Sequence, residues 1–159
     1  MSTMSTAPQR PSIPDLYDAY WREFDAYVEP VGDDWMRELK RDSYWTSFQL
    51  HRPGVHIACV ILTPPRRPER AMRVELSLIK KVIGADADRL FDLLKNWRVG
   101  LESTVGGDLE FESHTHNQYQ VAKTFLDCDP WNREDWPRQH ALLVEWLRRF
   151  NEAFGARGV

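Results

Sequence analysis

Alternating hydrophobic and polar positions predict three β-strands in the first half of the chain. The first covers residues 44–50, and an Arg-Pro-Gly turn at 52–54 leads into a β-branched second strand at 55–62. The third, at 72–78, has the clearest period of two, with one apolar face and one wet face. Because the second strand is apolar on both faces, we expect it in the middle of a sheet that is covered on both sides.

Helical periodicity surrounds and separates the strands. Apolar residues recur at helical spacing over residues 15–29, 86–101 and 135–154, and each stretch is bounded by start or stop signals such as Pro14, Gly106 and Gly155. Two further strands, at 109–112 and from residue 119 to residue 125, form a second hairpin. The element order is therefore α-β-β-β-α-β-β-α. This order predicts an α+β fold in which helices pack against a mainly antiparallel five-stranded sheet.

The chain divides into a tail and one domain. Residues 1–14 are small, polar and proline-rich, and they lack the apolar side chains needed to order themselves. We expect them to form a flexible tail before a single α+β domain at residues 15–159, a length that can bury a sizeable core.

Charge and cysteine content narrow the function classes. The formal net charge is −3, so the protein as a whole lacks the basic field of a general nucleic-acid binder. No apolar run approaches the roughly 20 residues of a membrane span. With two cysteines and no signal peptide, the sequence favours free thiols in the cytoplasm.

Several segments together resemble the bacterial DUF4268 family (domain of unknown function 4268). They are the stretches 72–76, 90–95, 102–109, 129–136 and 146–154. The resemblance covers roughly Leu16 to Phe154 and carries no established activity. Members of the family are often the C-terminal part of longer bacterial proteins, some with a nuclease-like domain. The resemblance therefore implies work near nucleic acid, linked to restriction or defence, as an alternative function.

Basic and imidazole side chains supply the candidate ligand sites. A nucleic-acid contact would use the basic loop before the third strand and the arginines that follow it, with Trp45 or Trp131 as a stacking platform: Arg66, Arg67, Arg70 and Arg73. His114 and His116 are the nearest approach to a metal site, but no further ligand stands at the spacing that metal sites use, so we expect solvated loop histidines. No motif predicts a cofactor.

Catalytic motifs are weak throughout the chain, which favours a role without catalysis. A metal-dependent, nuclease-like hydrolase would need Glu110 and Glu112 on one strand with Lys123 beside them. Exposed strand faces often carry such charges simply to prevent pairing with the edge of another sheet.

Seven tryptophans exceed the usual share for this length. Core stripes account for most of them, and Trp35 and Trp131 remain as interface candidates. The sequence thus predicts a binding or interaction module that associates with itself or with a protein partner, with nucleic-acid association as the alternative.

Overall fold

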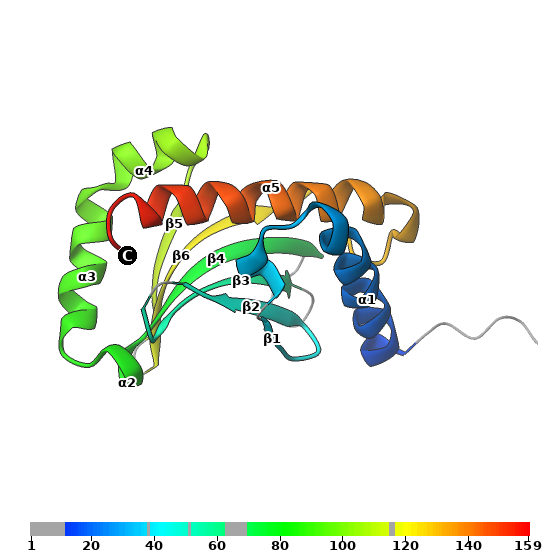
Figure 1. Ribbon diagram of the computed structural model, residues 1–159, viewed down its shortest axis with the longest axis horizontal. Helices are drawn as coiled ribbons and strands as arrows, with labels where there is room; N and C mark the ends of the chain where they lie inside the picture. Colours follow the sequence, from blue (N-terminus) through cyan, green and yellow to red (C-terminus); the bar gives the residue numbers. More distant parts are fainter. Residues whose placement is uncertain (1–11, 38, 51, 63–69, 115–116) are drawn as a thin grey trace, which may run out of the picture.

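A single antiparallel sheet organises the chain in the computed structural model, which describes residues 12–37, 39–50, 52–62, 70–114 and 117–159 (Figure 1). The strands follow the spatial order β1-β2-β3-β4-β6-β5, and every neighbouring pair is antiparallel. Their bounds are β1 Leu39–Arg41, β2 Trp45–Gln49, β3 Val55–Leu62, β4 Ala71–Ile79, β5 Glu110–His114 and β6 Gln118–Phe125. The five predicted strands and the α+β class are confirmed, and the short strand β1 joins the edge beside β2.

The helices form a second layer. They are α1 Ile13–Val31, η1 Asp34–Arg37, α2 Lys80–Ile83, α3 Asp86–Asn96, α4 Arg98–Val105, η2 Arg133–Asp135 and α5 Trp136–Gly155. The long helix α5 crosses the sheet and packs on β3 and β4, while α1 and α4 contact α5 from its two ends (Figure 1). The predicted middle helix is broken at Trp97, which ends α3 and begins α4.

One large core lies between α5 and the sheet. Met72, Val74 and Leu76 point into it and are fully buried, together with the aromatic stripe of α5 that ends at Phe154. The alternation in β4 therefore places the apolar set on the helix side, as predicted. The prediction that the other face is wet is wrong, because Arg73, Glu75 and Ser77 are only 7%, 8% and 6% exposed.

The second face of the sheet is buried at β3, as expected, although no described helix packs on it. β3 does lie inside the sheet, but α5 packs on one face only. On the opposite face Ala58, Val60 and Leu62 form a separate small cluster with Ala71, against which Tyr44 and Trp45 pack. No helix residue of the described ranges belongs to this cluster. We call this face of the sheet the open face.

Gly54, in the turn between β2 and β3, is expected to resist substitution. Its φ is +85°, and an added Cβ would stand 2.8 Å from Ile83 Cγ1. Gly54→Ala should lower the free energy of unfolding by about 2 kcal/mol, from left-handed strain and this close contact. Gly158→Ala is the matched control, since Gly158 has a φ of +75° but open space around it, and should lose about 1 kcal/mol. Urea unfolding of both variants checks the order, and equal losses would contradict the role of the contact.

Candidate functional site

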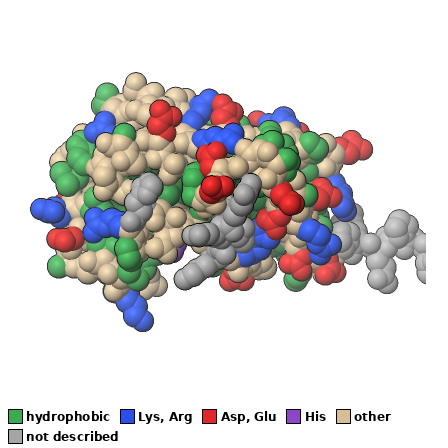
Figure 2. Space-filling view, viewed as in Figure 1, with side chains coloured by type: hydrophobic (Ala, Val, Ile, Leu, Met, Phe, Trp, Pro, Cys, Tyr) green, Lys and Arg blue, Asp and Glu red, His purple; other side chains and the backbone are tan. Residues whose placement is uncertain are grey.

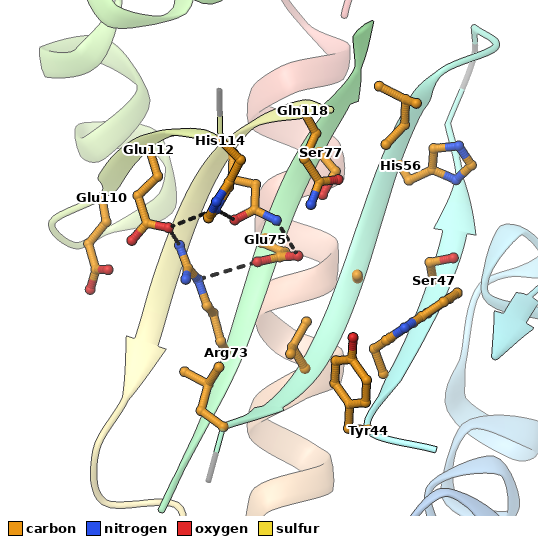
Figure 3. A pocket seen from close by; sticks show the side chains of 16 residues that line it. Tyr44, Ser47, His56, Arg73, Glu75, Ser77, Glu110, Glu112, His114 and Gln118 are labelled. Atoms are coloured by element: carbon orange, nitrogen blue, oxygen red, sulfur yellow. Dashed lines mark hydrogen bonds and ion pairs between the residues drawn. The ribbon is translucent and has the colours of Figure 1, made fainter. Parts of the chain in front are cut away.

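A hollow of about 760 Å³ lies on the open face of the sheet (Figure 3). Its lining comes from all of the strands from β2 to β6, with Tyr44 just before β2, and no described helix residue belongs to it. The members are Tyr44, Trp45, Ser47, His56, Ala58, Val60, Leu62, Arg73, Glu75, Ser77, Ile79, Glu110, Glu112, His114, Gln118 and Gln120.

Strand register explains why these side chains meet. Alternate residues of a strand share a face, and residues paired across strands stand side by side. Trp45 pairs with Val60, and Val60 pairs with Arg73, so an aromatic ring, an aliphatic side chain and a guanidinium follow one another across three strands. In the next row, Glu75 stands between Ala58 and Ala122, whose small side chains leave room above the sheet.

Three charged side chains form the polar end of the hollow. Arg73 Nη2 lies 2.9 Å from Glu112 Oε2, and Arg73 Nε lies 3.4 Å from Glu75 Oε2. Arg73 and Glu75 are only 7% and 8% exposed, whereas Glu112 on β5 is partly exposed. Ionic side chains are seldom buried to this extent unless they are paired. Burial of the Arg73 and Glu75 charges costs desolvation free energy, which their pairing offsets in part.

Hydrogen bonds extend this group toward β6. The Gln120 amide donates to Glu75 Oε1 at 3.1 Å, and its oxygen lies 2.9 Å from His114 Nε2. His114 Nε2 also lies 3.6 Å from Glu112 Oε2, which closes a ring of five polar side chains (Figure 3). We call Arg73, Glu75, Glu112, His114 and Gln120 the polar ring.

Burial changes the acidity of Glu75. Desolvation raises the pKa of this carboxyl above its ordinary value, Arg73 opposes the rise, and Glu112 adds to it. A carboxyl with a raised pKa takes up a proton more readily in the folded than in the unfolded chain. Its contribution to stability is therefore lost as the pH rises through the folded-state pKa.

The other end of the hollow is apolar. Val60 and Leu62 are each 8% exposed, and Tyr44 and Trp45 pack against them. Because strands lie about 4.8 Å apart, the Cα atoms of Trp45 and Arg73 are separated by roughly 10 Å. The aromatic and aliphatic side chains of the hollow therefore lie close enough to the polar ring for one small molecule to contact both.

The predicted arginine site is only partly within the described residues, since Arg66 and Arg67 lie outside them. Arg70 is exposed, lies 3.9 Å from Asp129 and stacks over Trp131 with its Cζ 4.6 Å from the ring centroid. Arg73 belongs to the polar ring instead. Figure 2 shows basic and acidic side chains interspersed over the coloured surface in view.

The two tryptophans predicted as interface residues are half-buried. Trp35 meets Phe48 edge to face at 5.8 Å between ring centroids, and both Trp35 and Trp131 pack against the main core. Part of each ring is thus used within the fold, and an interface role for the exposed remainder stays a prediction.

The structure brings together only part of the predicted metal and hydrolase residues, since His114 Nε2 lies 3.6 Å from Glu112 Oε2. His114 lies in the polar ring, while His116 falls outside the described residues. Within the described ranges, no three His, Cys, Asp or Glu side chains are placed to hold a metal ion. Glu110 and Glu112 line the open face, whereas Lys123 points to the helix face, with its Nζ 5.7 Å from the Trp146 ring centroid.

Glu75 and Gln120 are site residues that the sequence did not predict. The signal was present in part, because the polar face of β4 repeats Arg73, Glu75 and Ser77. What makes them a site is the insertion of β6 between β4 and β5, which brings Gln120 and Glu112 alongside.

Comparison with known proteins identifies a family. None of the helices in the described ranges is long and apolar enough to cross a membrane. No curated protein and no solved structure matches the chain significantly. The sequence model described as "Domain of unknown function (DUF4268)" matches residues 16–157, nearly the whole chain and the span that the resemblance predicts. The chain therefore belongs to the DUF4268 family.

Proposed function

We propose that the protein is a non-catalytic binding module, and that a small amphipathic molecule occupies the hollow on the open face of its sheet. One observation carries the proposal. The second apolar face of β3 lies beside the buried Arg73 and Glu75, and no lining residue of this hollow belongs to a helix. Apolar surface and buried charge on one concave wall are the two components of small-molecule sites.

Size and chemistry support this assignment. A volume near 760 Å³ falls within the roughly 300–1,000 Å³ of ligand pockets. Trp45 and Val60 would contact the apolar part of the ligand, and the polar ring would contact its polar part. The acid and base side chains of the ring pair with one another, which favours a role in binding over one in proton transfer.

The test uses 2-phenylethanol, a neutral amphipathic probe. Titration followed by two-dimensional amide NMR should move the signals of the open-face rows, including Trp45, Val60 and Arg73, with a dissociation constant of about 1–10 mM for so small a molecule. Ala58→Phe should abolish the saturable shifts, because Ala58 stands between Ser47 and Glu75 and the added ring would fill the hollow.

Val99→Phe provides the control, since Val99 on α4 is 82% exposed. It adds the same ring away from the sheet and should leave binding unchanged. Shifts scattered over the protein, or saturable binding that survives Ala58→Phe in a folded variant, would refute the proposed function. Self-association and nucleic-acid binding through the arginine stretch stay predictions of the sequence.

A further inference from the structure

The polar ring contains a buried cation whose donors are poorly used. Arg73 is 7% exposed, yet its Nε and Nη2 make no hydrogen bond with any described group, despite the ion-pair distances to Glu75 and Glu112. Thr124 Oγ1, on the β6 residue paired with Arg73, is also buried without a partner among the described residues. Guanidinium N–H groups without well-aligned acceptors in a hollow indicate a place for an acceptor group of a ligand.

The acidic side chains around Arg73 point to a second requirement. The lining carries Arg73 against Glu75, Glu110 and Glu112, a formal charge of +1 − 3 = −2 with both histidines neutral. Glu110 is exposed and has no ion-pair partner among the described residues. Carboxylates at the edge of a hollow attract a cationic group and repel a purely anionic ligand.

We propose that the ligand is an amino-acid-like zwitterion with an apolar side chain, its carboxylate on Arg73, its ammonium on Glu110 and Glu112, and its side chain on Trp45 and Val60. This inference rests on the proposed function and names the ligand class of the same hollow. It accounts for a cation and acids being present together, which a simple amine or a simple acid would not require.

Geometry agrees with a single head group of both charges. The ammonium and carboxylate of an amino acid are attached to one carbon, so they need an acceptor and a donor that are adjacent. Arg73 Nη2 and Glu112 Oε2 are 2.9 Å apart, and Glu110 lies two residues from Glu112 on the same face of β5 (Figure 3). The apolar row through Val60 and Trp45 begins beside Arg73 and leads away from both acids.

Glu75 is the side chain that a ligand carboxylate would displace from Arg73 Nε, from which its Oε2 lies 3.4 Å away. Because desolvation raises the pKa of Glu75, this carboxyl can accept a proton at lower cost than a surface glutamate and can release its hold on the guanidinium. A carboxylate of the ligand would then take the place of Glu75 at Arg73 Nε. Binding should consequently be accompanied by net proton uptake.

Three compounds with the same phenylethyl body form the experiment: L-phenylalanine, 2-phenylethylamine and 3-phenylpropionate. Isothermal titration calorimetry at pH 7 should rank phenylalanine first, with the amine at least about tenfold weaker and the acid weaker still, because each lost charge contact is worth about one factor of ten or more. Repeating the phenylalanine titration in two buffers of different ionisation enthalpy should reveal the proton uptake.

Variants separate the two contacts. Glu110→Gln removes an exposed charge and should weaken phenylalanine and the amine about three- to tenfold, while leaving the acid unchanged or bound more tightly. Glu134→Gln, an exposed substitution in η2 outside the hollow, is the control and should change none of the three. Arg73→Met should weaken phenylalanine and the acid but not the amine, and Glu110→Gln decides the matter if that variant does not fold.

The outcomes distinguish this inference from the proposed function. If 2-phenylethanol binds in the hollow but phenylalanine binds no more tightly than the amine or the acid, the zwitterion is wrong and the binding module stands. If neither the neutral probe nor any of the three charged compounds binds at the open face, both are wrong. Tightest binding of phenylalanine with no response to Glu110→Gln would also overturn the assignment of the ammonium contact.

Discussion

Replacing Arg73 with alanine is expected to lower the free energy of unfolding by about 3–5 kcal/mol at neutral pH. The substitution removes the one cation that faces both Glu75 and Glu112 and leaves Glu75, itself 8% exposed, as an uncompensated acid. Urea unfolding followed by circular dichroism measures the loss. It should be smaller at low pH, where Glu75 takes up a proton and no longer needs a counter-charge.

Two further variants show whether burial and pairing cause the effect. Arg70→Ala is the matched control, because Arg70 is the same residue type in an exposed pair at 3.9 Å, and it should lose less than about 1 kcal/mol. The double variant Arg73→Met, Glu75→Gln removes both buried charges and should be more stable than Arg73→Ala, since replacing a buried pair is less harmful than breaking it. A loss for Arg73→Ala no greater than for Arg70→Ala would contradict this account of the polar ring.

Acidification below pH 6.5 is expected to destabilise the fold through His140, by up to about 3 kcal/mol near pH 4. This imidazole on α5 is 2% exposed and lies among Tyr20, Phe24 and Trp136, with ring centroids 4.6, 5.5 and 6.2 Å away. Burial lowers its pKa from 6.5 to about 4, against smaller opposing effects of Glu23 and a backbone hydrogen bond with Tyr20.

The sign follows from proton counts. Between pH 6.5 and about 4 the unfolded chain carries a proton on His140 and the folded chain does not, so unfolding becomes more favourable as the pH falls. Glu75 acts in the opposite direction, because its pKa is raised in the folded state. A comparison of unfolding free energies at pH 7 and pH 4.5 between the wild type and His140→Leu isolates the histidine.

His140→Leu should show a weaker loss of stability on acidification, by about 2–3 kcal/mol over this range, because leucine has no proton to take up in the unfolded state. The carboxylates common to both proteins cancel in the difference. Parallel pH profiles for the two proteins would show that His140 titrates alike in the folded and unfolded chains.

Local pattern predicted most of the fold and little of the site. The period of two in β4 was enough to assign which residues face α5, because alternate residues of a strand lie on the same face of the sheet. The two apolar faces of β3 predicted a strand covered on both sides, and both faces are buried. On the open face Val60 and Leu62 pack with Trp45, a contact between strands that the pattern along β3 does not contain.

The polar ring depends on strand order, which hydrophobic periodicity does not encode. Glu112 was read as an edge charge and His114 as a loop residue, and both readings fit the local sequence. Only the order β4-β6-β5 places their side chains beside Arg73 and Gln120. Likewise the break between α3 and α4 at Trp97 has no proline to mark it, so the apolar stripe predicted one continuous helix.

The insertion of β6 between β4 and β5 also determines the order in which the strands can pair during synthesis. A nascent chain that has emerged as far as β5 has no strand with which β5 can pair, since β5 reaches the sheet only through β6. The pairing of β4 with β6 joins segments that are distant in the sequence, so it closes late and slowly. The open face is therefore complete only once synthesis has passed Phe125, and fragments that end earlier should present β4 as an unprotected, aggregation-prone edge.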